Sequence, residues 1–159
     1  MLNTSRMHGF TLIELMVTLA VLAIILAFAV PNMSTFSKKQ AVRSTTDELL
    51  LSMVYARSEA LKRNESIYIL PAAGGWNNGW CVTQSSANCN VQSKLLRSFN
   101  PSGKNLVLSG FGSQVKFDQR GIRAAGGNEF SVKDSSLPES EERCIQLSRT
   151  GRAAMVACS

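Results

Sequence analysis

A continuous apolar run near the N-terminus is the strongest pattern in the sequence. From Phe10 to Val30 the only polar side chains are those of Thr11, Glu14 and Thr18. As a helix with a rise of about 1.5 Å per residue, this run is roughly 30 Å long, which matches the hydrocarbon core of a bilayer. We therefore expect residues 10–31 to form a membrane-spanning helix.

Beyond this run, the apolar residues take the spacing of an amphipathic helix. Pro31 should kink the helix or open a turn, because proline lacks a backbone N–H and clashes with the preceding turn. Glu59 and Arg63 are spaced as a helical ion pair, and Asn64 is suited to the end of a helix. Residues 32–64 are therefore predicted as an amphipathic helix. The side chains expected to face the core are Val42, Leu49, Leu50, Met53, Val54, Ala60 and Leu61.

The remainder, residues 65–159, carries short β-rich runs separated by glycine, asparagine and serine. The sequence "SRTGRA" predicts a hairpin turn with Gly151 in the left-handed conformation. Trp76 and Trp80 are expected to pack in the core or in a turn. The fold class is therefore α+β, a long N-terminal helix packed on a C-terminal antiparallel β-sheet domain. Strands are predicted at 67–70, 80–83, 95–99, 106–108, 115–118, 130–133, 143–148 and 154–157.

The composition says little about the fold, but it limits which classes of function the chain can have. The 159 residues fit one ordinary domain with an appendage, and the net charge of +6 suits either a solvated basic surface or an anionic partner. The sole histidine is His8, and no G-x-S-x-G, phosphate-binding loop or H-E-x-x-H motif occurs. We therefore expect neither an enzyme nor a bound cofactor.

The four cysteines predict disulfide bonds. Cys81, Cys89, Cys144 and Cys158 are an even set in a small domain that must be exported, and they allow three pairings. The local pairs Cys81–Cys89 and Cys144–Cys158 are favoured. The alternative is a zinc site, but the spacings C-x7-C and C-x13-C differ from the short spacing of zinc knuckles.

Glu14 is the residue that a plain membrane anchor does not explain. A charge at the centre of a bilayer costs on the order of 2.5–3.5 kcal/mol even on lenient scales. If the chain is cleaved after Gly9, the new amino group of Phe10 in one subunit could neutralise Glu14 of its neighbour. Glu14 would then set the register of assembly. A secretory signal peptide is the alternative, although Pro31 lies close to its best cleavage site, Ala27–Ala29.

The stretch "GFTLIEL", followed by the apolar run and Pro31, resembles the class III signal of type IV pilins and type II secretion pseudopilins. In that family a prepilin peptidase cleaves after the glycine that matches Gly9. It then methylates the residue that matches Phe10, and the residue that matches Glu14 guides assembly. The resemblance implies that residues 1–9 are a leader, whose removal with Arg6 lowers the net side-chain charge from +6 to +5.

Four further stretches resemble the GspH/FimT domain, namely "YARSEALKRN", "GGWNNGWCV", "VKFDQRGIR" and "CIQLSRTGRAAMV". They imply a minor pilin of the FimT/FimU kind, which primes a type IV pilus or sits near its tip. Such a protein is first a single-pass inner-membrane protein with a cytoplasmic N-terminus and a periplasmic head. Its implied partners are other minor and major pilins, the prepilin peptidase, the inner-membrane assembly platform and, before assembly, membrane lipid.

Two other functions fit the sequence. One is pseudopilin H of a type II secretion system, which has the same fold in a short periplasmic pseudopilus. The other is DNA binding during natural transformation, through backbone phosphates. The candidate residues are Arg143, Arg149 and Arg152, with Arg120 and Arg123 as further members. FimT-like DNA receptors carry a G-R-x-R motif, which Gly151 and Arg152 match, whereas Ala154 replaces the second arginine.

Overall fold

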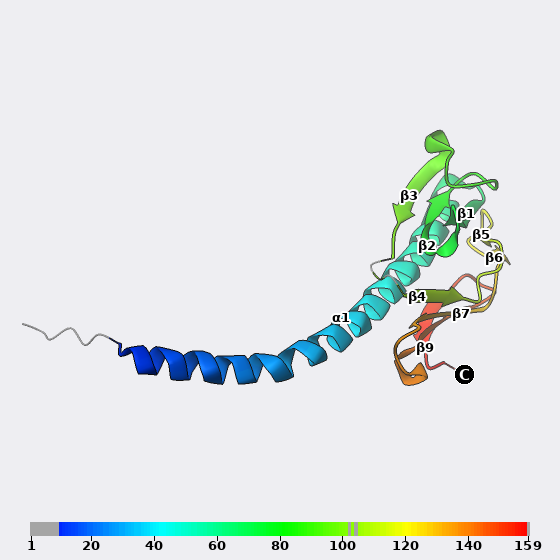
Figure 1. Ribbon diagram of the computed structural model, residues 1–159. Helices are drawn as coiled ribbons and strands as arrows, with labels where there is room; N and C mark the ends of the chain where they lie inside the picture. The colour runs from blue at the N-terminus through cyan, green and yellow to red at the C-terminus, as the bar shows by residue number, and fades with distance from the viewer. Residues whose placement is uncertain (1–9, 102, 104, 159) are drawn as a thin grey trace, which may run out of the picture. The chain divides into compact units, whose positions relative to one another are not determined.

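The structure is a computed structural model (Figure 1), and it describes residues 10–101, 103 and 105–158, with the backbone alone at residues 28–32. The chain divides into two compact units, Met1–Phe36 and Ser37–Ser159. The leader predicted at residues 1–9, including Gly9, lies outside the described residues. Helix α1 (Leu12–Arg63) contributes to both units and is continuous through Pro31, so the turn considered at Pro31 is not formed.

In the first unit, large apolar side chains are exposed on all sides of α1. Phe10 precedes the helix and is 86% exposed. The helical members of this set are Leu12, Ile13, Leu15, Met16, Val17, Leu19, Val21, Leu22, Ile24, Ile25, Leu26, Met33 and Phe36. A helix that is apolar all round is stable only in apolar surroundings. Judged over the part of the chain that the structure describes, no helix has the length and apolarity of a membrane span.

In the second unit, one face of α1 is buried against the β-strands. Of the core residues predicted on this helix, Val42, Leu49, Met53 and Ala60 are buried and Leu50 is half-buried. The prediction was wrong for Val54 and Leu61, which are each 52% exposed. Small and polar residues complete the buried face instead, and they are Thr45, Thr46, Ser52, Ala56 and Glu59.

Two antiparallel sheets form the remainder of this unit. The five-stranded sheet has the order β3-β2-β1-β5-β6, and the four-stranded sheet has the order β4-β7-β8-β9. The strands of the first are β1 (Ile67–Ala72), β2 (Gly75–Thr83), β3 (Leu95–Phe99), β5 (Val115–Phe117) and β6 (Arg123–Ala125). Those of the second are β4 (Leu106–Ser109), β7 (Glu129–Asp134), β8 (Arg143–Leu147) and β9 (Ala153–Val156). The short 3₁₀ helices are η1 (Gln92–Lys94) and η2 (Glu139–Glu141).

Each of the eight predicted strands is present, and the α+β fold class is confirmed. Two details were wrong. Strand β2 begins at Gly75, five residues before the predicted strand at 80–83, and β6 was not predicted because Arg-Ala-Ala carries no β signal.

A single core joins α1 to both sheets. It includes Leu49 and Met53 of α1, Ile69 of the five-stranded sheet, and Phe130 and Ile145 of the four-stranded sheet. The sheets therefore pack on the helix as one domain rather than as two.

Aromatic side chains extend this core between the sheets. Trp76 stacks on Phe111 with ring centroids 4.4 Å apart and donates its indole N–H to the carbonyl of Gly112, and Phe111 in turn contacts Phe130. Trp80 is fully buried. Both tryptophans therefore serve packing, as predicted.

Candidate functional site

Thr11 and Glu14 form a capping box at the start of α1. The Glu14 carboxylate accepts hydrogen bonds from the backbone N–H and the hydroxyl of Thr11, at 2.9 and 3.0 Å. In return, the Glu14 N–H donates to the Thr11 hydroxyl oxygen at 3.3 Å. This reciprocal pattern satisfies N–H groups that a helix start leaves without partners. The T-x-x-E spacing in the sequence is a signal of this role, although the capping box was not predicted from it.

A shallow hollow lies beside Glu14 on the same face of α1. Its volume is about 320 Å³, and it is lined by Phe10, Ile13, Glu14, Val17 and Thr18. Residues at these spacings share one side of a helix. The carboxylate is thus placed in an otherwise mostly apolar depression at the helix start, where a second chain could reach it.

The hairpin turn between β8 and β9 is formed as predicted. Gly151 has a φ of 80°, its N–H donates to the carbonyl of Ser148, and Ser148 and Arg152 bond across the turn. Arg149 and Arg152 are exposed on this turn and have no ion pair with any residue that the structure describes.

The other arginines of the predicted basic patch differ in where they lie. Arg120 and Arg123 belong to a turn beside this hairpin, since the Arg123 N–H donates to the carbonyl of Arg149 at 3.1 Å and Gly151 packs on Gly121. Arg143 is at the opposite end of β8, roughly 13 Å from Leu147 along the strand. Arg120 bonds to Asp118 at 3.1 Å. Arg123 is half-buried and donates to the carbonyls of Gly126 and Gly127, so it holds a loop and is not available to a ligand. Of the five arginines, Arg143 therefore lies apart at the far end of β8, and the side chains of Arg120 and Arg123 are held by groups of their own turn.

Three of the GspH/FimT-like stretches meet at one junction. The Arg57 side chain of α1 donates to the carbonyl of Gly121 at 3.1 Å. Gly151 packs against the same carbonyl so closely that a Cβ there would lie 2.1 Å from the oxygen. The residues of these three stretches therefore hold the helix and two turns together.

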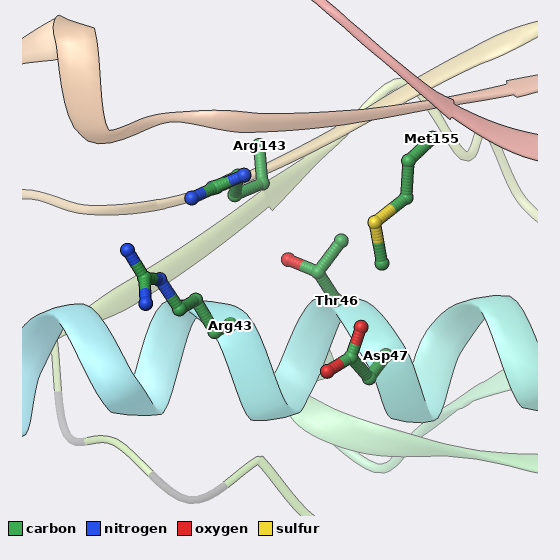
Figure 2. A pocket seen from close by; sticks show the side chains of 5 residues that line it. All are labelled: Arg43, Thr46, Asp47, Arg143 and Met155. Atoms are coloured by element: carbon green, nitrogen blue, oxygen red, sulfur yellow. The ribbon is translucent and has the colours of Figure 1, made fainter.

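A second pocket, of about 380 Å³, lies in the head between α1 and the four-stranded sheet (Figure 2). Its lining residues are Arg43, Thr46, Asp47, Arg143 and Met155. Figure 2 shows the guanidinium groups of Arg43 and Arg143 extending to the same side of the pocket from the helix and from the sheet. Arg43 was not a predicted site residue, because nothing in the sequence places it near Arg143.

Both favoured disulfide pairings occur in the structure. Cys81 of β2 is bonded to Cys89 and Cys144 of β8 is bonded to Cys158, with Cα separations of 5.8 and 5.1 Å. All four sulfurs are thereby occupied. Among the residues that the structure describes, no cluster of histidine, cysteine and carboxylate side chains could hold a metal ion.

Comparisons with known proteins support the resemblance read from the sequence. A family model described as "Type II transport protein GspH" matches residues 45–151. A second model, described as "Prokaryotic N-terminal methylation motif", matches residues 4–30. No curated protein sequence matches the chain significantly.

Solved structures with the same fold are also known. The chain is similar to two crystal structures of the type IV minor pilin FimU from Pseudomonas aeruginosa strain PAO1, in space groups P21 and P65. The first has a TM-score of 0.62 at 19% identity and covers 77% of this chain and 92% of the other. The second has a TM-score of 0.59 at 20% identity and covers 72% and 92%. At this identity the likeness establishes the fold.

Proposed function

Since the chain belongs to the GspH family of pilin-like proteins and carries an N-terminal methylation motif, we propose that it is a minor pilin of a type IV pilus. In this proposal, prepilin peptidase removes residues 1–9 and methylates Phe10. Residues 10–31 are the transmembrane and assembly helix, and residues 32–64 continue it as the amphipathic helix. Residues 65–159 form the head. The protein then primes the fibre or sits near its tip.

The observation that carries this proposal is the environment of Glu14. Its carboxylate lies in a mostly apolar hollow at the start of α1, in the part of that helix whose described side chains are apolar on nearly every side. Thr11 supplies hydrogen bonds to this carboxylate but no positive charge. A positively charged amino group of a neighbouring Phe10 would supply that charge, which makes incorporation dependent on the correct neighbour.

The same features support membrane storage before assembly. An all-round apolar helix needs lipid or other helices around it, and a fibre of packed pilin helices provides the second environment. We propose an inner-membrane protein with its N-terminus in the cytoplasm and its head in the periplasm. The assembly platform and the other pilins are the partners that would transfer it from lipid to fibre.

Glu14→Gln tests this function sharply, because it removes the charge and keeps the cap. Glutamine can replace glutamate in a capping box. We expect Glu14→Gln to be cleaved and membrane-bound like the wild type but to enter sheared fibres at least about tenfold less, as loss of one desolvated ion pair implies. The measurement is the amount of this subunit in purified fibres relative to membranes.

Two matched variants separate charge from helix capping. Thr11→Ala removes the cap and keeps the carboxylate, and Thr18→Val removes a second polar group from the hollow. Both should enter fibres much more efficiently than Glu14→Gln. Equal incorporation of Glu14→Gln and wild type, or a mature N-terminus other than Phe10, would refute the proposal.

A second candidate function is favoured by the description of the matching family, which names type II transport. A pseudopilin H would use the same helix and head in a secretion pseudopilus. Deletion of the gene separates the two, since loss of surface pili with normal protein secretion supports the pilus and the reverse supports the pseudopilus. Complementation with Glu14→Gln should fail in either system.

DNA binding remains a third candidate, supported by the exposed Arg149 and Arg152. Phosphate contacts by these side chains would make binding salt-dependent and independent of sequence. A mobility shift of the full-length protein in detergent with duplex DNA, at two salt concentrations, tests it. Arg152→Ala should weaken binding and reduce its salt dependence, whereas Arg123→Ala would act only through folding.

A further inference from the structure

The pocket between α1 and the four-stranded sheet is a gap in the packing of the helix against the sheet. Along β8, Arg143, Ile145 and Leu147 point to one face, and the latter two are buried in the core shared with α1. Met155 of β9 is paired with Ile145 and therefore lies on that same inner face. Yet Met155 is 45% exposed, because the pocket separates it from the helix.

Two cations at this pocket have no direct contact with a carboxylate. The guanidinium groups of Arg43 and Arg143 make no side-chain hydrogen bond and no ion pair within 4 Å among the described residues, although both lie near enough to Glu141 to help lower the pKa of its carboxyl group. The neighbouring Lys39 differs, since it bonds to Glu141 at 2.7 Å. The lining itself holds two guanidinium groups and one carboxylate, that of Asp47, while the nearby Glu141 carboxylate is paired with Lys39. Guanidinium forks suit the two oxygens of a carboxylate.

The pocket also has an apolar side. Figure 2 shows Met155 and Thr46 reaching into the space from the sheet and from the helix. The Thr46 hydroxyl donates to the carbonyl of Val42 at 2.7 Å and Thr46 is buried, so the exposed Met155 thioether is the apolar group left to pack against a ligand. A ligand that fits therefore has a short apolar stem and one anionic end.

We propose that this pocket receives an acidic side chain from a neighbouring pilin subunit, with its stem against Met155 and its carboxylate between Arg43 and Arg143. The choice of a pilin neighbour rests on the proposed function. DNA fits less well, because a phosphate backbone is a continuous polyanion and the pocket is flanked by the carboxylates of Asp47 and Glu141. A single carboxylate avoids most of that repulsion.

The test observes Met155 directly in the full-length protein in detergent micelles. Methionine methyl groups are labelled with ¹³C, and the Met155 signal is assigned with Met155→Leu. The probe is a capped tetrapeptide with one central glutamate, compared with the same peptide carrying glutamine. We expect the glutamate peptide to shift the Met155 signal with an affinity at least about tenfold higher than that of the glutamine peptide.

Single substitutions show which arginines the Met155 response to the glutamate peptide depends on. Arg43→Gln and Arg143→Gln should each remove the preference for glutamate, whereas Arg149→Gln, an exposed arginine beyond the other end of β8, should keep it. Equal responses to the two peptides, or a preference that survives both pocket variants, would overturn the proposal. So would a short DNA duplex that shifts Met155 at lower concentration than the peptide and depends on the same two arginines.

Incorporation into fibres tests whether the carboxylate that enters the pocket comes from a neighbouring subunit. Arg143→Glu should lower incorporation of the subunit several-fold, and Arg149→Glu should not. Normal incorporation of Arg143→Glu would exclude a neighbouring subunit as the source. Failure of the peptide titration would overturn the proposed carboxylate site but not the proposed pilin function, because the titration involves no fibre. The Glu14→Gln experiment, in turn, tests assembly and does not involve the pocket.

Discussion

Gly151 is a residue whose backbone conformation strongly restricts substitution. Its φ of 80° is one that side chains disfavour, and a Cβ would lie 2.1 Å from the carbonyl oxygen of Gly121. Gly112 has a φ of 62° but no described atom within 4 Å of the same position. Gly112→Ala should therefore cost about 1 kcal/mol, and Gly151→Ala clearly more, because only the latter adds a clash with backbone. Thermal unfolding of the two variants checks this, and equal losses would contradict it.

Asp118 makes one turn of the head sensitive to acid. Its carboxylate accepts hydrogen bonds from the backbone N–H groups of Ile122 and Arg120, and from the Arg120 side chain. These bonds, chiefly that from Ile122, hold the pKa of Asp118 below its ordinary value. A lowered folded-state pKa gives stability that is complete at neutral pH. That stability is lost as the pH falls below about 4 toward the lower folded-state pKa.

Asp118→Asn checks this contribution. The variant should be less stable than the wild type at pH 7, and the difference should shrink at pH 3, when thermal unfolding is followed by near-ultraviolet circular dichroism. A difference that stays constant with pH would show that the turn does not depend on the charge.

At the scale of elements, α1 shows which face of a helix matters for stability. Met53 is buried at 1% exposure, whereas the adjacent Val54 is 52% exposed. Met53→Ala should cost about 2–5 kcal/mol because it leaves a cavity, and Val54→Ala should change the free energy of unfolding by roughly 0.5 kcal/mol or less. Denaturant unfolding of both variants measures this, and similar losses would mean that the helix face is assigned wrongly.

The same helix shows how far sequence patterns reach. Apolar spacing identified Val42, Leu49, Met53 and Ala60, but it also selected Val54, since apolar residues line more than one side of α1. The other buried residues of this face were not predicted because most of them are polar. Ser52, for example, is buried because its hydroxyl bonds to the carbonyl of Leu49 at 2.7 Å, which satisfies it inside the helix.

Which residues far apart in the chain would come together could not be predicted from the sequence, for a different reason. The signals that identified Glu14, the strands and the disulfides are local. Arg43 and Arg143 are a hundred positions apart, and only the packing of α1 on the four-stranded sheet brings them to one pocket. The length of β8 in turn explains why Arg143 and Arg152, close in sequence, lie at opposite ends of that strand.

At the scale of the whole molecule, each sheet of the head has its own disulfide. Cys81–Cys89 anchors a loop to the five-stranded sheet, and Cys144–Cys158 anchors the C-terminal segment to β8. Closing loops of this size stabilises a protein by about 2–3 kcal/mol in the chain-entropy description. Replacing either pair with alanine should therefore lower the free energy of unfolding by a similar amount.

Only one of these bonds should affect the pocket. Strand β9 carries Met155, pairs with β8 alone, and is held beyond its end by Cys158. Loss of Cys144–Cys158 should let β9 separate from β8 and weaken the Met155 response to the glutamate peptide, whereas loss of Cys81–Cys89 should leave that response intact at equal cost in stability. The peptide titration on both paired variants measures the difference. If both lost the response equally, the pocket would depend on the stability of the whole head rather than on β9.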